Sequence, residues 1–407
     1  MAHIEGLTIR CYRALRDVTL GMTFEHQENE PLQRMIAAIG PNGSGKSTLM
    51  DALGFLSDCM QIGVEEACDR PHRGGFNRLR TRGQSGPIEF EIYYRQEPDS
   101  RPISYSLSID VDKDGRPHVA RERLRQRRKG ERKGKPFSFL DLTDGRGQAW
   151  SGEATSTGEV NAKREIELED PQRLGIVTLG NLAEHPRIVA FREFLGSWYL
   201  SYFVPNQART LPMTGAQKHL DREGQNLANY LQHFERAHRS RLDVVLARIA
   251  RRIPGIEKID TEQSLDGRLL IQFNDRGYKD PFFASDMSDG TLKMLAYMLL
   301  LEDPEPAPLI GIEEPENGLH HQLLAGLAEE MRLISSKSSG PQIFVTTHSP
   351  YFVDALTPEQ VWILEKDKMG VSTAKRAADI QSVKNLSDEG LPLGSLWYSN
   401  HFGRGNP

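Results

Sequence analysis

Hydrophobic and polar residues alternate in several stretches of the N-terminal third of the chain. This period of two is typical of strands with one buried face. It predicts strands within residues 7–22 and at 88–94, 103–111 and 118–124, the last two joined by a DKDG turn. Residues 34–40 are instead a nearly continuous apolar run ending in glycine, which predicts a strand buried on both faces.

The apolar spacing is helical from about residue 186 to 250, and 226–253 is predicted as one long helix that Pro254 and Gly255 end. Residues 134–174 are rich in Gly, Ser, Thr and charge with little periodicity, so a loop or weakly ordered insertion is expected there. Buried strands with a helix between them return at 308–314, 342–348 and 360–367.

The composition is that of an ordinary globular protein: 407 residues, 38% hydrophobic and 26% charged, with a net charge of -5. Its three cysteines fit no disulfide framework and no paired zinc spacing, which favours a reduced compartment. The N-terminus lacks the form of a signal peptide, and the apolar stretch 294–301 is too short for a membrane span. We therefore expect a cytoplasmic protein.

A phosphate-binding loop follows the apolar strand at 34–40. The sequence GPNGSGKST at 40–48 matches GxxxxGK[ST] and precedes a predicted helix. Its glycines let backbone N–H groups converge on phosphate oxygens, Lys46 reaches the β- and γ-phosphates, and the Ser47 hydroxyl is a Mg²⁺ ligand. The predicted nucleotide-binding residues are Gly40, Pro41, Asn42, Gly43, Ser44, Gly45, Lys46, Ser47 and Thr48.

Acidic residues end the predicted strand at 308–314. Glu313 is expected beside the metal, and Glu314, one residue on, is expected to polarise the attacking water. Carboxylates also cap helix N-termini, which is a fair alternative for Glu316. Because Mg²⁺ prefers oxygen ligands, His320 and His321 are expected to belong to a turn and helix start rather than to the metal site.

Two further motifs complete an ordered set. Ser288-Asp289-Gly290-Thr291 directly precedes a strongly apolar helix, and His348 ends the strand at 342–348. With the phosphate loop and the acidic strand, this order resembles the ATP-binding-cassette superfamily. Within it the chain is similar to the SMC/RecF-like branch, and more narrowly to short prokaryotic ATPases of anti-phage systems of the Septu and retron-associated type. The motifs extend from 40 to 350.

The resemblance implies a composite ATP site in a homodimer or higher homo-oligomer. Ser288, Asp289, Gly290 and Thr291 would bind the γ-phosphate held by the other subunit, His348 would contact the γ-phosphate, and residues 316–320 would reach across the dimer. Arg13 would touch a nucleotide phosphate, although an ordinary surface arginine is an alternative reading.

The chain departs from the family pattern in two places, and one family residue is not assigned. Glu313 stands where most cassette ATPases have aspartate, and His321 replaces the usual proline. A glutamine of the Q-loop type is not assigned, and the candidates are Gln61, Gln84 and Gln96.

The resemblance also implies an α/β fold: a P-loop cassette-type head with a mostly parallel core sheet, an antiparallel β lobe, a helical insertion and no long coiled coil. We expect one ATPase domain, 1–407, in four parts. These are a nucleotide-binding and antiparallel β part, a flexible insertion, a helical lobe, and a part with signature, acidic strand, switch histidine and tail, at 1–135, 136–174, 175–284 and 285–407.

Two hypotheses for the function of this MgATP-dependent ATPase remain open. In the first it controls a separately encoded effector, a nuclease or toxin, in anti-phage defence. In the second it is a RecF-like DNA-binding repair or recombination ATPase. The signature differs from the LSGGQ of transporters, no long coiled coil is predicted, and no DxD follows residues 362–368 as a fused Toprim nuclease would require.

Two segments are candidates for partner binding. Residues 121–135 hold nine Arg or Lys, and on a strand Arg121, Arg123, Arg125 and Arg127 would share one face and track the phosphates of DNA or RNA. A solvated loop or an acidic protein partner is the alternative. The tail, 391–407, carries Trp397, Tyr398 and Phe402; we hypothesise that it docks a partner or second protomer, and packing on its own domain is the alternative.

Overall fold

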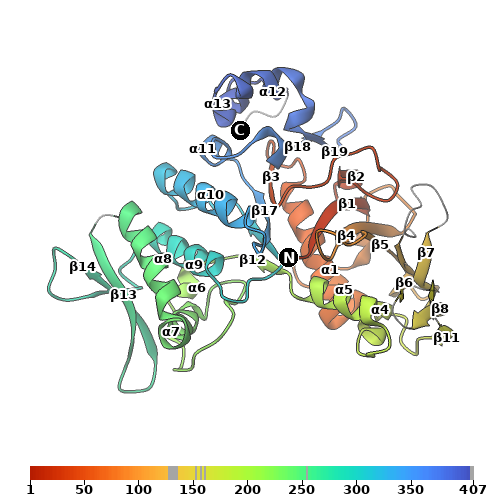
Figure 1. The fold of residues 1–407 in the computed structure, drawn as a ribbon, viewed down its shortest axis with the longest axis horizontal. Coiled ribbons are helices and arrows are strands. Elements are labelled where there is room, and N and C mark those ends of the chain that lie inside the picture. Colours follow the sequence, from red (N-terminus) through yellow and green to blue (C-terminus); the bar gives the residue numbers. More distant parts are fainter. Residues whose placement is uncertain (127–135, 152–153, 156–157, 160–161, 254, 404–407) are drawn as a thin grey trace.

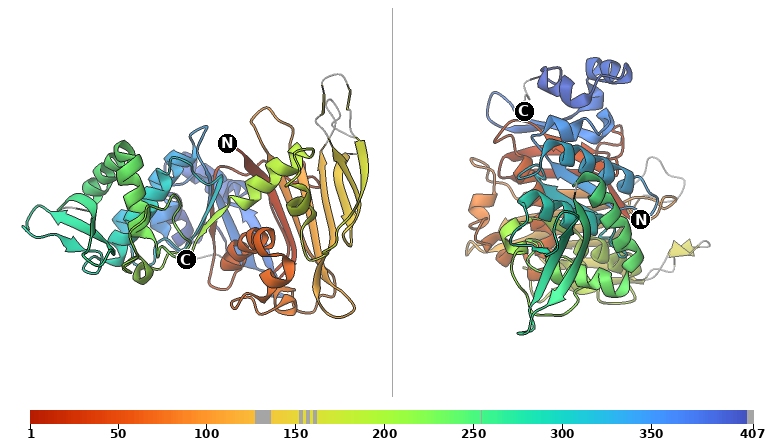
Figure 2. Two further views of the ribbon diagram at one scale, coloured as in Figure 1. Left: turned by 90° about the horizontal axis from the view of Figure 1, so that it is seen from below. Right: turned by 90° about the vertical axis from the view of Figure 1, so that its left-hand side faces the viewer.

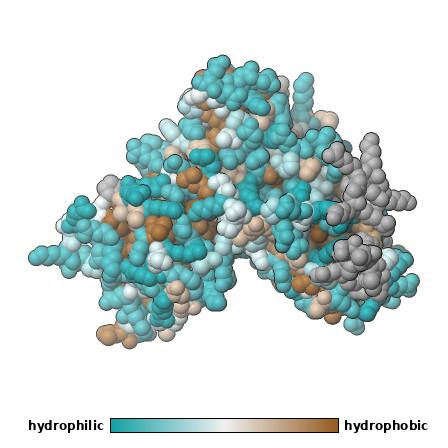
Figure 3. Space-filling model, viewed as in Figure 1, coloured by the Kyte–Doolittle hydropathy of each residue, from teal (hydrophilic) through white to brown (hydrophobic). Residues whose placement is uncertain are grey.

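The computed structural model describes residues 1–126, 136–151, 154–155, 158–159, 162–253 and 255–403. Two lobes flank the central strands, and the C-terminal helices lie above them at the apex (Figure 1). The surface is deeply notched between the two lobes (Figure 3).

The lobe on the right in Figure 1 contains an antiparallel sheet of eight strands in the order β11-β8-β7-β6-β5-β4-β1-β2. Figure 2 shows these strands following one another from the centre of the molecule outwards. The strands predicted within 7–22 and 88–124 are confirmed. Their bounds are β1 His3–Tyr12, β2 Leu15–Gly21, β4 Ile88–Arg95, β5 Ile103–Val111, β6 Pro117–Gln126, β7 Phe137–Thr143, β8 Arg146–Ser151 and β11 Ala162–Glu167.

The prediction of a loop or flexible insertion at 136–174 was wrong for most of its described residues. Strands β7, β8 and β11 extend the large sheet, and β9 (Ala154–Thr155) pairs with β10 (Gly158–Glu159). Leu140 and Leu142 are buried in the core of this lobe. Polar residues dominate β8 and β11 because one face of an antiparallel sheet is solvated. Pairing of β7 with β6, of β8 with β7 and of β11 with β8 supplies the order that local propensity lacks.

The central sheet has six strands in the order β12-β16-β17-β3-β18-β19. Its first five strands are parallel and only the edge strand β19 is antiparallel, which confirms the predicted mostly parallel core. The bounds are β3 Met35–Ile39, β12 Tyr199–Ser201, β16 Leu309–Glu313, β17 Gln342–Thr346, β18 Val361–Lys366 and β19 Ser372–Arg376.

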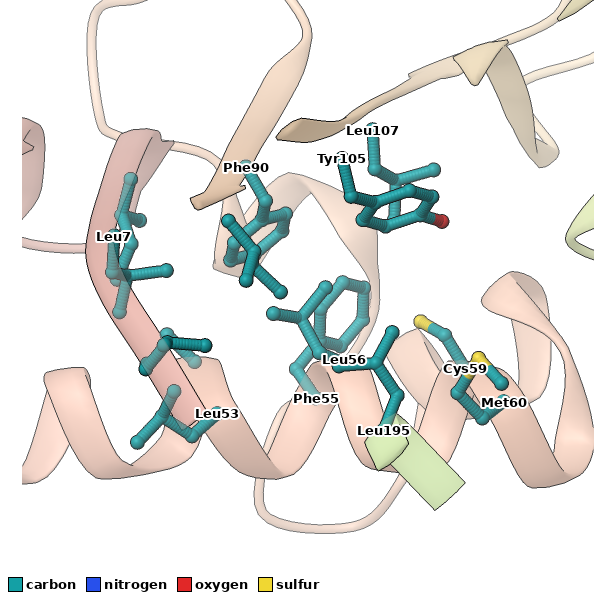
Figure 4. Close-up of a cluster of buried hydrophobic side chains, with 14 of the residues drawn as sticks. Leu7, Leu53, Phe55, Leu56, Cys59, Met60, Phe90, Tyr105, Leu107 and Leu195 are labelled. Carbon is teal, nitrogen blue, oxygen red and sulfur yellow. The ribbon is translucent and has the colours of Figure 1, made fainter. Parts of the chain in front are cut away.

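Helix α1 (Lys46–Ile62) joins the two sheets. Thirteen of its 17 residues are buried, so nearly every face of the helix packs against protein. Phe55 lies between rings of the large sheet, with its centroid 5.6 Å from that of Tyr12 and 5.9 Å from that of Phe90. Figure 4 shows Leu53, Phe55 and other side chains of α1 pointing toward side chains of that sheet. The phosphate loop is therefore anchored by a buried helix.

The lobe on the left in Figure 1 contains only the part of the predicted helical lobe that follows β12. Helices α4 (Gly175–Leu179) and α5 (Pro186–Gly196) lie instead with the large sheet on the right, where Phe191 and Phe194 pack against Tyr94. Two further differences concern the helices and strands of the left lobe. The single helix expected at 226–253 is two helices, α7 (Leu227–Ala237) and α8 (Arg239–Arg252), because His238 has non-helical backbone angles. A small sheet that was not predicted follows, formed by β13 (Ile256–Gln263), β14 (Leu269–Asp275) and β15 (Phe282–Phe283).

The C-terminal tail packs on its own domain. Trp397 is fully buried and Phe402 is 4% exposed, whereas Tyr398 is 72% exposed. The Gly394 N–H donates to Asp354 at 2.8 Å, which holds α13 (Leu393–Tyr398) against α11 (Pro350–Val353). The hypothesis that Trp397 and Phe402 dock a partner was therefore wrong, since burial of large apolar rings in the chain's own core is the more favourable arrangement.

The remaining helices cover the sheets and connect their strands. None of the described helices is long and apolar enough to cross a membrane. Their bounds are α2 Val64–Asp69, α3 Phe76–Leu79, α4 Gly175–Leu179, α5 Pro186–Gly196, α6 Pro205–Ala208, α9 Asp289–Leu301, α10 His321–Ser335 and α12 Gln381–Asp388, with 3-10 helices η1 Pro358–Gln360 and η2 Ala377–Asp379.

Candidate nucleotide site

The phosphate loop, residues 40–48, joins the end of β3 to the start of α1. Gly40, Gly43 and Gly45 have φ values of 140°, 75° and 110°, which side chains rarely tolerate. At Gly40 a Cβ atom would also lie 2.0 Å from the Leu364 carbonyl oxygen. These three glycines are therefore required by the loop itself, as the motif predicted.

Lys46 is buried inside the curve of this loop. Its Nζ donates to the carbonyl oxygens of Gly40 at 2.8 Å and Pro41 at 3.1 Å. Burial lowers the pKa of Lys46, and the neighbouring carboxylate of Glu314 opposes that shift. The buried Ser44 hydroxyl has no hydrogen-bond partner among the described residues. A buried ammonium group and a free hydroxyl in a glycine loop fit an anionic ligand such as phosphate.

Glu313 and Ser47, the two predicted metal ligands, lie together. Glu313 ends β16, and Ser47 at the start of α1 lies close to its carboxylate. Burial raises the pKa of Glu313, and the neighbouring Ser47 hydroxyl opposes this. A hydroxyl and a carboxylate are both oxygen donors, so the pair fits a hard cation such as Mg²⁺.

Glu314 and His348, the predicted catalytic pair, face each other across the ends of two parallel strands. The Glu314 N–H donates to the Thr346 carbonyl at 2.9 Å, and its φ of 43° turns the chain sharply after β16. Its carboxylate lies 3.4 Å from His348 Nε2 and accepts a hydrogen bond from Asn317 at 3.0 Å. Burial lowers the pKa of His348, Lys46 lowers it further, and Glu314 opposes both.

Glu316 has a role that the sequence did not indicate. Its carboxylate accepts hydrogen bonds from the His348 backbone N–H at 2.5 Å and the Thr347 hydroxyl at 3.0 Å. Burial raises its pKa. Glu316 therefore ties the acidic turn to the histidine segment, and it does not cap a helix.

His320 and His321 lie in a turn and helix start, as predicted. His320 Nδ1 accepts from the Gln322 N–H at 3.4 Å, so it caps the N-terminus of α10. Its ring stacks on His321, whose ring is 5.0 Å from that of Tyr351.

The signature residues form the N-terminus of α9. Ser288 is the N-cap residue, and its hydroxyl accepts from the Thr291 N–H at 3.2 Å. Asp289 pairs with Arg209 at 2.6 Å, and the same guanidinium donates to the Met287 carbonyl. Arg209 thus fixes the signature turn from a segment about 80 residues away in the chain, which is why motif spacing gave no sign of it.

The signature turn packs against the acidic turn of the same chain. A Cβ atom at Gly290 would lie 2.7 Å from the Gly318 carbonyl, so glycine permits this close approach. The Lys293 ammonium donates to the Asn317 carbonyl at 2.6 Å. Lys293 was missed by the motif analysis, although a lysine inside the otherwise apolar helix 292–301 is a signal that could have identified it.

Arg13 lies against α1 rather than extending into solvent. Its guanidinium is 3.0 Å from Asp51 and donates to the His72 carbonyl at 2.9 Å. Tyr12 O–H donates to the same Asp51 carboxylate at 2.7 Å. These contacts hold the segment after β1 against the helix that begins at the phosphate loop, and the phosphate contact of Arg13 stays a prediction.

The strand beside β16 does not end in glutamine. Gln61 lies near the C-terminal end of α1, opposite the phosphate loop, and Gln84 and Gln96 lie in loops of the large-sheet lobe. β12 pairs with β16 so that Ser201 is opposite Ile312. Tyr202 follows Ser201 in the chain, so its position along the strand corresponds to that of Glu313 in β16.

A buried arginine joins two turns of α1, and a second arginine connects one of these turns to the segment after β12. The Arg73 guanidinium, 1% exposed, lies 2.9 Å from Asp51 and 2.7 Å from Asp58. Arg222, which follows β12 in the chain, also pairs with Asp58 at 3.1 Å. No sequence motif indicated this network, because its members are brought together only by the fold.

The basic segment is paired with carboxylates. The side chains of Arg121 and Arg123 both lie 3.4 Å from Asp141, and Arg125 lies 3.7 Å from Glu91. Arg127 lies outside the described residues. The three described members of the predicted row do share one face of β6, but neighbouring strands place acidic groups on the same face.

A protein-family model described as "AAA domain, putative AbiEii toxin, Type IV TA system" matches residues 37–354, more than half of the 407-residue chain. The chain belongs to this AAA-domain family. The part that matches the AAA-domain family runs from β3 to the end of α11 and includes every motif of the candidate site. The comparison with curated proteins gave no match.

Among solved structures, the fold is similar to that of SMC heads. An Smc head bound to the C-winged helix domain of ScpA has a TM-score of 0.52 at 16% identity, over 92% of this chain and 97% of that chain. An Smc head with an extended coiled coil, bound to the C-terminal domain of ScpA derived from Pyrococcus furiosus, gives 0.49 at 15% identity over 96% and 100%. The SMC head from Thermotoga maritima gives 0.43 at 14% identity over 92% and 98%. The first likeness shows the SMC-head-like ATPase fold, as predicted.

The Arg73 network generates a stability prediction. Arg73→Ala should lower the free energy of unfolding by about 3–5 kcal/mol, because Asp51 and Asp58 would keep buried charges without their shared partner. Urea denaturation followed by circular dichroism measures this change. Arg78→Ala, at an exposed arginine of α3, is the matched control and should change stability by less than about 0.5 kcal/mol. Equal losses in both variants would refute the structural role of Arg73.

Proposed function

We propose that this protein is an ATPase that binds MgATP at the phosphate loop and hydrolyses it. The observation that carries the proposal is the gathering of Lys46, Ser47 and Glu313 with Glu314 and His348 at one sheet edge, where the Glu314 carboxylate lies 3.4 Å from His348 Nε2. Phosphoryl transfer depends on positioning and charge stabilisation, and these residues supply both.

Each residue has a distinct part in the proposed hydrolysis. Lys46 and the loop N–H groups bind the β- and γ-phosphates. Ser47 and Glu313 hold Mg²⁺, which supplies positive charge to the phosphates. Glu314 accepts the proton of the attacking water, and its bond from Asn317 keeps the carboxylate in place. His348, beside Glu314, donates a hydrogen bond to the γ-phosphate.

We further propose a homodimer with composite sites, in which Ser288, Asp289, Gly290 and Thr291 complete the site of the other subunit. The contact between Gly290 and Gly318 supports this, because it joins the signature turn and the acidic turn into one continuous surface. A second copy that meets one of these turns then also meets the other. ATP bound between two copies would therefore hold them together.

The ATPase would control a separately encoded effector, a nuclease or toxin, in anti-phage defence of the Septu and retron-associated kind. The AAA-domain family is described by a putative toxin and a toxin–antitoxin system, which supports an effector over a repair role. The carboxylates beside Arg121, Arg123 and Arg125 also weaken the RecF-like alternative, since they compete with DNA phosphates for the same cations.

Two substitutions should separate ATP binding from hydrolysis. Lys46→Ala should abolish ATP binding, because it removes the buried charge inside the loop. Glu314→Gln should retain binding and lower the hydrolysis rate by about a hundredfold or more, since an amide cannot take the proton of the water. Equilibrium ATP binding and phosphate release measure the two effects. Glu389→Gln, at an exposed glutamate, is the control, and wild-type hydrolysis by Glu314→Gln would refute its role.

The composite site is tested by mixing two inactive proteins. Lys46→Ala damages the phosphate loop and Ser288→Arg damages the signature, so each homodimer should be inactive. An equal mixture should recover about a quarter of the wild-type rate, because half of the dimers are mixed and each mixed dimer has one intact site. A mixture with no recovered activity, formed from subunits that exchange, would refute sites shared between subunits.

The effector is tested with Glu314→Gln protein expressed with its neighbouring genes and purified in MgATP. Native mass spectrometry should find a stoichiometric second polypeptide, because a dimer that does not hydrolyse ATP keeps the bound conformation. The Lys46→Ala protein, prepared in the same way, is the control without nucleotide. A bare dimer that retains duplex DNA would contradict effector control and favour the RecF-like alternative.

A further inference from the structure

A cavity of about 520 Å³ lies at the opposite end of the central sheet from the phosphate loop. Its wall comes from the end of α5, the start of β12, the end of α9 and the loop before β16. Trp198, Leu220, Leu300 and Pro308 give it an apolar lining. The volume is within the range of about 300–1,000 Å³ that small-molecule sites have, and such sites favour junctions between lobes.

The polar groups of this cavity are mainly acidic. Asp303 and Glu305 line it, and His219 is the only lining side chain that can carry a positive charge. Asp303 is 6% exposed and accepts hydrogen bonds from the Tyr230 hydroxyl at 2.6 Å and the Glu305 N–H at 2.8 Å. Each carboxylate oxygen of Asp303 can accept one more hydrogen bond.

One buried group in this wall has no hydrogen-bond partner. Trp198 is 4% exposed, and its indole nitrogen has no partner among the described residues. Burial raises the pKa of Asp303, and its hydrogen bonds from Tyr230 and Glu305 oppose that rise. A cation near Asp303 would compensate that charge, and a flat ring would fit the apolar walls.

Two elements run directly from this cavity to the candidate ATP site. Leu300 lines the cavity near the C-terminal end of α9, whose N-terminus is capped by Ser288 roughly 20 Å away. Pro308 lines the cavity just before β16, whose other end is Glu313 roughly 17 Å away. A ligand that shifts the cavity wall therefore acts on both the signature turn and the acidic strand.

We propose that this cavity binds a small organic cation with a flat apolar body, and that its occupancy is transmitted to the ATP site through α9 and β16. The amine or amidine group lies at Asp303, and the ring lies against Trp198 and Leu300. The binding stands apart from ATP hydrolysis, whereas the transmission rests on the proposed ATPase function.

Binding is tested by isothermal titration calorimetry of the full chain with tryptamine as the probe. Indole-3-ethanol, which has the same ring and no charge, is the control ligand. Tryptamine should bind at millimolar or lower concentration, and Asp303→Asn should weaken it by about tenfold or more, because a hydrogen bond to a charged group is lost. Asp388→Asn, at an exposed aspartate of α12, is the matched control and should leave the affinity unchanged.

Three results would overturn the site: no tryptamine binding at millimolar concentration, equal binding of indole-3-ethanol, or equal affinity of the Asp303→Asn protein. Trp198→Phe is a second variant, which keeps the apolar wall and should weaken the binding of tryptamine. It provides the test if the Asp303→Asn protein does not fold. If the Trp198→Phe protein keeps its affinity for tryptamine, the proposed contact between the tryptamine ring and Trp198 is refuted.

Transmission is measured as the ATP hydrolysis rate with and without tryptamine in the same samples. Saturation should change the rate by about fivefold or more, as expected for coupled sites. An unchanged rate with bound tryptamine would refute the transmission alone. A protein that binds tryptamine but hydrolyses no ATP under any condition would refute the proposed ATPase function and leave the binding site standing.

Discussion

The parallel pairing of β3, β17 and β16 is the constraint on which the candidate site depends. Thr346 lies opposite both Glu313 and Ala38, so the three strands end at the same level of one sheet edge. That edge receives the phosphate loop, the two glutamates and His348 from segments far apart in the sequence. The register of these three strands, rather than any single contact, creates the site. A shift of one residue in that register would move each of these groups away from its neighbours.

Helix α1 connects this edge of the central sheet to both lobes. It begins at the phosphate loop, packs Phe55 into the large sheet, and presents Asp51 and Asp58 to the buried Arg73. Arg222 reaches one of these carboxylates, Asp58, from the segment after β12. Removing water from three charges is costly, and it is tolerated here because each charge has close partners of opposite sign. The network therefore fixes where the phosphate loop stands relative to the signature lobe.

The predicted site residues that the structure brings together share one property: their signal is local. The glycines of the loop, Lys46, and the acidic end of β16 each belong to a short motif next to a buried strand, so a few neighbouring residues suffice to identify them. The errors concern long-range partners. Strand β7 pairs with β6 and β8 pairs with β7, so both gain their order from neighbours in the sheet. Helix α13, which carries the buried Trp397, packs against α11, and the contact of Glu316 with His348 spans 32 residues of chain.

Arg209 and Lys293 show how such distant partners shape the signature. Arg209 holds Asp289 from the segment that follows β12, and Lys293 reaches the carbonyl of Asn317 after the acidic strand. The N-terminus of α9 is thus fixed from both neighbouring strands, while its C-terminal end forms a wall of the cavity between the lobes. Because α9 is a rigid helix with one end at the signature turn and the other at the cavity, it cannot move at one end alone. In the proposed mechanism, a group that fills the cavity would act on the same helix whose N-terminus carries Ser288, which would give a signal a short route to the candidate site.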